Sequence, residues 1–180
     1  MPLLMRWGKM EPRLSGQQLQ GRATIPYDFD AGRLMTFDME RLHLPGDKMK
    51  TTLSGTRLLN PESLPSLSVR ADNFSLGKHH FGRLEADIER SGRGLVTSLL
   101  TTEDKTFSLS GQARWLVDAA DEFGQRTFVD ATITSTDTQQ TAKRLAYNSG
   151  IISDQMEIMM DVDWPGAPRS DFMEALNGEV

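Results

Sequence analysis

The chain contains no cysteine among its 180 residues. Disulfide bonds, thiolate ligands for metals and cysteine nucleophiles are therefore excluded. The absence does not indicate a compartment, because an oxidising environment also tolerates a protein without thiols.

Histidine is scarce as well, with three residues in the sequence. His79 and His80 are adjacent, so on a strand they would point to opposite faces, and His43 lies in a different segment. Because a metal site draws several ligands to one point, we expect no metal site in this chain.

Long hydrophobic runs are also missing. No apolar stretch approaches the roughly 20 residues that span a bilayer, and residues 1–7 are too short a start for a secretory signal. Residues 176–180 read as a strand cut short. We therefore expect the chain to be a segment of a longer protein, with any targeting segment or membrane anchor outside it.

An excess of positive charge is lacking too. Twenty-five acidic residues stand against twenty basic ones, which gives a formal net charge of −5 and a pI near 5.2. There is no long basic run and no stripe of alternating basic and aromatic residues. Nucleic acid is therefore not an expected partner.

What the sequence does contain is alternation of apolar and polar residues. Hydrophobic content is 38%, which is ordinary for a chain that packs a core. In residues 83–89 every second residue is apolar and the residues between are charged, and residues 107–117 repeat the pattern. A period of two predicts strands with one apolar and one solvated face.

Further strands and short turns predict a mainly β chain. Neighbouring strands joined by short turns favour antiparallel pairing, because parallel neighbours need a long crossover. The polar stretch 45–66 contains three prolines and is the best, though weak, internal boundary of the single segment 1–180. A shift of the apolar pattern at Leu42 indicates a bulge or a strand end. The predicted strands are 19–25, 33–44, 67–71, 83–89, 95–100, 107–117, 126–135 and 156–164.

One short helix is expected at about 137–149. Asp137 can cap its start with Gln140 three residues on, Ala142, Leu145 and Ala146 share one side, and Gly150 is a suitable left-handed stop. Such a helix can cap the end of an apolar face, although packing against a sheet edge is commoner.

No arrangement of residues predicts catalysis. The Ser-Gly pairs lack a nucleophile-elbow frame, and no glycine cluster opens a helix after a strand as phosphate-binding loops do. Glu85, Asp87 and Glu89 share a strand face, but a solvated face explains them better than an ion site. We expect no enzyme activity, no catalytic residues and no cofactor.

The apolar side of the alternating strands is the candidate functional surface. Its members share the inward positions of the period-two pattern. These residues are Leu84, Ala86, Ile88, Phe107, Leu109, Ala113, Trp115, Met156, Ile158 and Met160.

Five pieces of the sequence, taken in order, resemble the C-terminal part of the AsmA-like superfamily, specifically the large YhdP-type proteins of the Gram-negative envelope. The order of strand, Leu-Gly, Phe-Gly-Arg-Leu, Ser-Gly-Xaa-Ala-Xaa-Trp, short helix and Trp-Pro-Gly-Ala-Pro carries the resemblance over most of residues 13–180. The pieces are Leu14, Ser15 and Gly16 with Gln20, Gly21 and Arg22; residues 37–45; Leu76 and Gly77 leading to residues 81–85; residues 109–115; and residues 151–168.

The resemblance implies an elongated, curved antiparallel sheet that forms an open apolar groove. It further implies a periplasmic portion of an inner-membrane-anchored protein, whose groove carries phospholipid between the inner and outer membranes. The ten residues above would then line the groove, with acyl chains and the rest of the parent protein as partners. The membrane would be reached only through an anchor absent from this chain.

The residues alone leave a second possibility. The same strands can close into a β-sandwich, a structural or interaction module of the envelope with a sealed core and no lipid ligand. A groove predicts that phospholipid co-purifies with the protein, whereas a sandwich predicts that none does.

Overall fold

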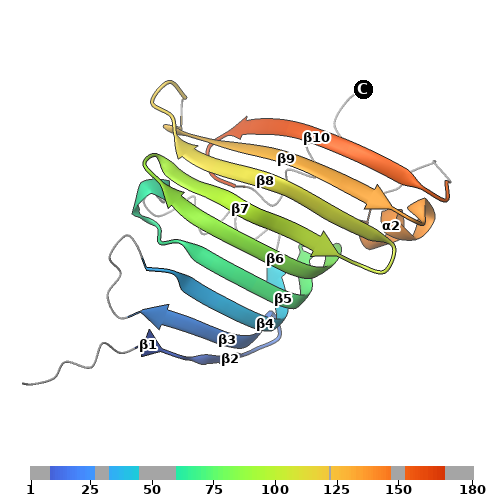
Figure 1. The fold of residues 1–180 in the computed structure, drawn as a ribbon, viewed down its shortest axis with the longest axis horizontal. Coiled ribbons are helices and arrows are strands. Elements are labelled where there is room, and N and C mark those ends of the chain that lie inside the picture. The colour runs from blue at the N-terminus through green and yellow to red at the C-terminus, as the bar shows by residue number, and fades with distance from the viewer. Residues whose placement is uncertain (1–8, 27–32, 45–59, 122, 147–152, 169–180) are drawn as a thin grey trace, which may run out of the picture.

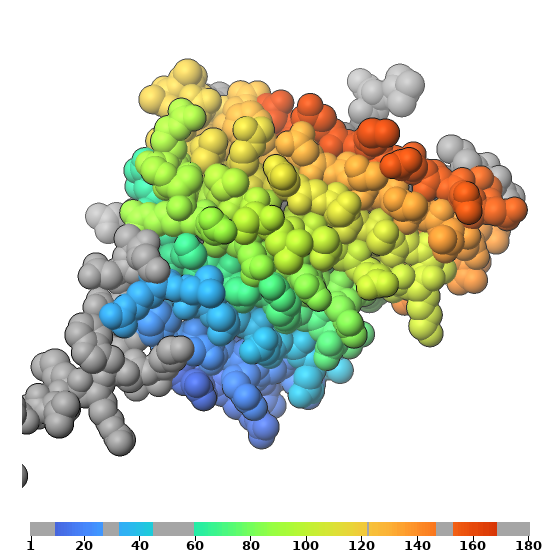
Figure 2. Space-filling view, in the orientation of Figure 1, coloured from blue at the N-terminus to red at the C-terminus, as the bar shows by residue number. Residues whose placement is uncertain are grey.

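The computed structural model describes residues 9–26, 33–44, 60–121, 123–146 and 153–168. Within these residues ten strands form a single sheet, in the order β1-β3-β4-β5-β6-β7-β8-β9-β10, and β2 pairs with β3 beside β1 (Figure 1). The strands follow one another across the sheet in chain order, as the colours of Figure 2 show from blue to red. The expected mainly β architecture is confirmed.

The strand bounds match the predicted alternation closely. Residues 107–117 form a strand over the predicted range. The strand predicted at 67–71 continues to Leu76, because it pairs with both neighbouring strands as far as that residue. The strands are β1 Lys9–Met10, β2 Arg13–Ser15, β3 Leu19–Pro26, β4 Met35–Leu44, β5 Leu67–Leu76, β6 His79–Ser91, β7 Gly94–Glu103, β8 Phe107–Val117, β9 Gln125–Ser135 and β10 Met156–Pro165.

One neighbouring pair departs from the antiparallel expectation. β4 and β5 run parallel, while the other neighbours run antiparallel. Parallel neighbours need a long connection that returns the chain to the same end of the sheet, and the proline-containing stretch 45–66 supplies that length. The sheet is therefore mixed. Strands on both sides of this stretch join one sheet, and the internal boundary predicted there stays a prediction.

Two irregularities adjust which side chains face the core. In β4, Met39 pairs with Gly21 and Arg41 pairs with Gln20, so Glu40 is an extra residue. This is the bulge that the shifted pattern near Leu42 predicted. In β6, Gly82 has a φ of 77° and lets Phe81 and Leu84, three positions apart, both be buried.

Two short helical elements pack at opposite ends of the strands (Figure 1). The 3-10 helix η1, Pro61–Ser63, contacts β7 and β8. The helix α2, Thr138–Arg144, contacts β6, and its N-cap Asp137 accepts a hydrogen bond from the Gln140 amide as predicted.

The helix ends earlier than the predicted residue 149. The amide of its C-cap Leu145 still bonds back to Thr141, and Ala146 takes a left-handed φ of 48° that ends the helix. The predicted stop at Gly150 lies outside the described residues.

Candidate functional site

Strand registers place the candidate residues of β8 and β10 in rows across the sheet. Leu109 lies opposite Ile133, which lies opposite Ile158. Directly opposite residues of paired strands share a face. The parallel rows are Phe107, Ser135 and Met156; Gly111, Ala131 and Met160; Ala113, Val129 and Val162; and Trp115, Thr127 and Trp164.

The candidate residues of β6 continue this surface. Leu84, Ala86 and Ile88 lie opposite Ala71, Val69 and Leu67 of β5. Through β7, Leu84 lies opposite Thr102, and Thr102 lies opposite Leu109. All ten predicted residues therefore occupy one face of the sheet, which we call the apolar face, and its reverse is the polar face.

Among the ten predicted residues, Ile158 at the C-terminal edge of the sheet is the most exposed. Leu84, Ala86 and Phe107 are buried, whereas Ile158 on the edge strand β10 is 39% exposed. The other predicted residues are partly buried: Ile88, Leu109, Ala113, Trp115, Met156 and Met160. The predicted surface is thus one continuous face with a closed side and a more accessible side.

Two hydrophobic clusters form the closed side. Met39, Ala71, Leu84 and Ala86 form the first, with Phe37 and Val69 among the side chains packed against it. The sequence prediction left out the contributions of β4 and β5. Alternation in residues 33–44 and 67–71 carried that signal, because Met39 and Ala71 share the inward positions of their strands.

The second cluster brings the helix onto the apolar face. Leu145 is 7% exposed and packs with Phe81, Phe107 and Ile133. Nδ1 of His79 lies 2.5 Å from the Leu145 carbonyl oxygen and donates to it. Of the two placements that the sequence left open, the structure thus has the helix over an end of the apolar face, with Thr138, Thr141 and Leu145 as its buried residues in place of Ala142 and Ala146.

Hydroxyl side chains also lie on the apolar face, and the prediction missed them. Thr127 donates to the Gly166 carbonyl at 2.8 Å, and Thr97 accepts from the Ala113 amide at 2.6 Å. Ser135 and Thr141 share a hydrogen bond of 2.9 Å. These bonds satisfy the hydroxyls, so the surface between them remains apolar.

Both described tryptophans keep their polar atoms engaged. Trp115 Nε1 donates to Oε1 of Gln125 at 2.9 Å, and Trp164 Nε1 donates to the Ala167 carbonyl at 3.0 Å. A partly buried indole normally finds such a partner. The rest of each ring contributes hydrocarbon to the apolar face.

The polar face carries paired charges. Arg70 donates two hydrogen bonds of 2.9 Å to the Asp87 carboxylate, and Ser68 donates a third of 2.6 Å. These bonds lower the pKa of Asp87, the Arg70 bond most strongly. Glu85 lies 3.8 Å from Arg70. Two of the three carboxylates that could have been read as an ion site, Glu85 and Asp87, thus pair with Arg70.

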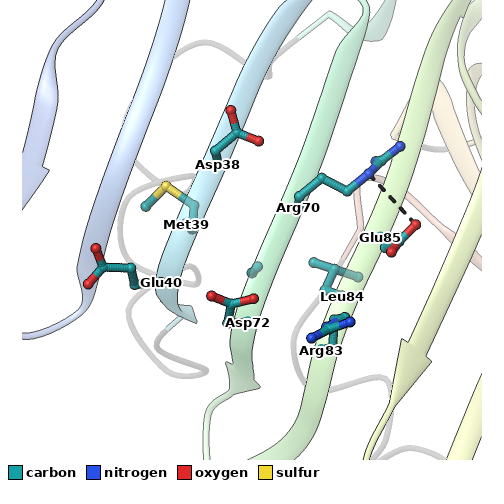
Figure 3. A pocket seen from close by; sticks show the side chains of 9 residues that line it. Asp38, Met39, Glu40, Arg70, Asp72, Arg83, Leu84 and Glu85 are labelled. Atoms are coloured by element: carbon teal, nitrogen blue, oxygen red, sulfur yellow. Dashed lines mark ion pairs between the residues drawn. The ribbon is translucent and has the colours of Figure 1, made fainter.

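A depression of about 380 Å³ lies over β4, β5 and β6 on the polar face. Figure 3 shows Asp38, Asp72 and Arg83 beside Arg70 and Glu85, with the Arg70–Glu85 ion pair dashed. Its lining is mostly charged, and it also includes Leu84 of the predicted set together with Met39 and Ala71.

The described ranges contain neither a cluster of metal-ligating side chains nor a membrane-spanning helix. No group of three histidine or acidic residues there could hold a metal ion. Nδ1 of His43 lies 2.7 Å from the Ser75 hydroxyl, and His79 and His80 are buried and exposed respectively. None of the described helices is long and apolar enough to cross a membrane.

Comparison with known proteins gives one family. The family model described as YhdP protein matches residues 5–180. No curated protein and no solved structure shows a significant match to the chain.

Proposed function

Because the chain belongs to the YhdP protein family, we propose that it is a segment of an envelope-spanning lipid-transfer protein whose apolar face carries phospholipid between the inner and outer membranes. The family indicates a bacterial envelope protein related to lipid transport. Its periplasmic location, an inner-membrane anchor elsewhere in the parent protein and the absence of enzyme activity belong to the proposal.

The observation that carries the proposal is the continuous apolar row across the last strands. Leu109, Ile133 and Ile158 lie side by side on three strands. Ile133 is 3% exposed in the cluster beneath Leu145, and Ile158 on the edge strand is 39% exposed. A large apolar surface persists in water when something apolar covers it. Acyl chains suit such a row because they require hydrocarbon contacts and no hydrogen-bond partner.

The competing sandwich finds less support. Two facing sheets would have to bury each other, whereas the strands of the described residues form one sheet. α2 covers one end of the apolar face through Leu145, and Met160 packs against the same cluster, while Ile158 on the edge strand is exposed. This arrangement favours an accessible surface over a sealed core.

Lipid extraction followed by mass spectrometry tests the proposal on the purified 180-residue chain. Phospholipid should co-purify with it, because the apolar face offers hydrocarbon contacts along several strands. Absence of lipid after purification in a mild, detergent-free buffer would support the sandwich.

Tryptophan quenching locates the lipid. Trp115 and Trp164 flank Thr127 on the apolar face, so phospholipid brominated on its acyl chains should quench their emission. A Trp7→Phe background leaves these two residues as the reporters. A water-soluble headgroup analogue that carries bromine is the control. Equal quenching by the brominated lipid and by this analogue would place the lipid elsewhere.

A further inference from the structure

The two edges of the sheet differ in how they resist pairing with another strand. At the N-terminal edge, β1 and β2 pair with β3 as pieces of two and three residues, separated at Glu11 and Pro12. Short, interrupted edges are a common protection against strand addition. At the other edge, β10 pairs with β9 over ten consecutive residues without a register shift.

The register defines which backbone groups of β10 face outward. Gly166 donates to the Gln125 carbonyl at 2.7 Å, one step beyond the ladder in which Trp164 lies opposite Thr127. Bonded and non-bonded pairs alternate in an antiparallel ladder. The amides of Glu157, Met159, Asp161 and Asp163 therefore point away from β9, and within the described residues no strand pairs with them.

The side chains of these same residues make the polar face of the edge acidic. Glu157, Asp161 and Asp163 are exposed, and Asp161 lies directly opposite Asp130 of β9. Like charges in directly opposite positions disfavour pairing. Arg126 bonds Asp163 at 2.5 Å, and Arg114 lies 3.9 Å from Asp130. Asp161 thus sits in a row where an added positive charge would be favourable.

A second copy of the chain is a poor occupant of this edge. Antiparallel pairing of β10 with itself would bring the carboxylates of Glu157, Asp161 and Asp163 from both copies onto one face. The apolar side of β10 adds a second requirement, an apolar neighbour, because Ile158 is 39% exposed there. On the polar side Met159 is 78% exposed. The matching strand is apolar on one side and basic on the other.

We propose that the edge of β10, which no strand of the described residues covers, is a docking site for an extended segment of another polypeptide in which apolar and basic residues alternate. The segment adds to the sheet through the outward amides and carbonyls of Glu157, Met159 and Asp161. Its apolar side chains extend the row of Ile158 and Met160, and its lysines or arginines meet the carboxylates of the polar face. The site needs no lipid and is independent of the proposed transport.

The test measures binding of fluorescent peptides of about ten residues to the 180-residue chain by anisotropy. One peptide alternates valine with lysine, a second alternates valine with glutamate, and a third carries the first composition in scrambled order. We expect the valine-lysine peptide to bind best, with binding that weakens as salt is added. Equal binding of the lysine and glutamate peptides, or of the ordered and scrambled peptides, would overturn the proposal.

Two variants place the peptide at the edge. Glu157→Lys combined with Asp161→Lys should weaken binding of the lysine peptide roughly tenfold and favour the glutamate peptide. Met159→Pro removes an outward amide that does not bond β9, so it should block docking while the fold survives. Unchanged lysine-peptide binding to the charge-reversed chain would refute the site even if the proline variant failed to fold. A concentration-dependent dimer in place of peptide binding would show that a second copy occupies the edge.

Discussion

At the scale of single residues, Gly82 is the position where backbone conformation and close packing coincide. Its φ of 77° is unfavourable for residues with a side chain. A Cβ atom built there would collide with the Glu103 carbonyl of β7. The glycine thus permits the bulge that buries both Phe81 and Leu84.

Substitution of Gly82 by alanine should lower the free energy of unfolding by about 2–4 kcal/mol, because the strained φ and the collision with backbone add together. The expected fall in Tm is on the order of 5–10 °C. Gly92→Ala is the matched control, since no atom lies within 4 Å of the added Cβ. Thermal unfolding by circular dichroism measures both, and equal Tm values would contradict the account of Gly82.

The Arg70–Asp87 pair gives a pH-dependent contribution. The folded protein lowers the pKa of Asp87, chiefly through the Arg70 hydrogen bonds. A lowered pKa stabilises the fold fully above the ordinary aspartate value of 3.8 and loses this effect as pH falls through the folded value. The side chains are 38% and 34% exposed, so the contribution is at most about 1 kcal/mol.

Asp87→Asn should therefore be less stable than the parent chain at neutral pH by up to about 1 kcal/mol. The difference should shrink as pH falls below about 4. Urea unfolding at a series of pH values measures this, with Glu89→Gln on the exposed part of the same strand as control. A difference that stays constant down to acid pH would mean that lost packing, not charge, explains the variant.

The faces of individual residues were largely predictable because alternation records them directly. Leu84, Leu109 and Ile158 share a face in the sequence and in the structure. Thr97 was missed, because a threonine in an inward position reads as polar until a backbone partner, here Ala113, satisfies its hydroxyl. Whether the predicted residues line a lipid path stays a prediction.

At the scale of elements, local sequence specifies the start of α2 but not its end. The sequence predicted its start because Asp137 and Gln140 interact locally. Its end depends on distant contacts: Leu145 turns into the cluster of Phe81 and Phe107, and local sequence does not record those partners. The parallel pairing of β4 with β5 was unpredictable for the same reason, since the choice of neighbour is made by tertiary packing.

Loss of the helix cap should loosen the cover on the apolar face. Asp137→Ala should cost about 1 kcal/mol, because the Gln140 amide loses its 2.9 Å hydrogen bond. Asp137→Asn keeps an acceptor oxygen and is the control. Hydrogen exchange should speed up for the amides of Gln140 and Thr141 in the alanine variant, whereas exchange in the middle of β8 should not change. Uniformly faster exchange would indicate global destabilisation instead.

At the scale of the whole molecule, a single-layer sheet leaves its apolar face dependent on what covers it. η1 and α2 pack at the two ends of the strands (Figure 1), and the row from Leu109 passes through the buried Ile133 to the exposed Ile158 of the edge strand. The sequence predicted a single apolar face, and the family membership of residues 5–180 was predicted from motif order. Alternation alone could not separate a groove from a sandwich, because both bury the same face.

Lipid transport along a surface fails if one position on the path is unfavourable, whereas the free energy of folding is shared over many strands. Leu109→Asp places a charge in the middle of the apolar row, beside Ile133, where burying it against acyl chains without a partner costs several kcal/mol, roughly 2–7. Ser110→Asp is the matched control, because Ser110 is the next residue of β8, is exposed on the polar face and lies opposite Thr132.

Both variants should be placed in the full-length parent protein, with their levels in the envelope measured. Leu109→Asp should lose lipid crosslinking to a photoreactive residue at Trp115 and weaken the outer membrane, while Ser110→Asp should match the parent. Comparing the two variants separates a blocked path from poor expression, since the substituted positions are adjacent in β8 and lie on opposite faces of the sheet. Normal crosslinking and membrane integrity in well-expressed Leu109→Asp would show that lipid does not pass along this row.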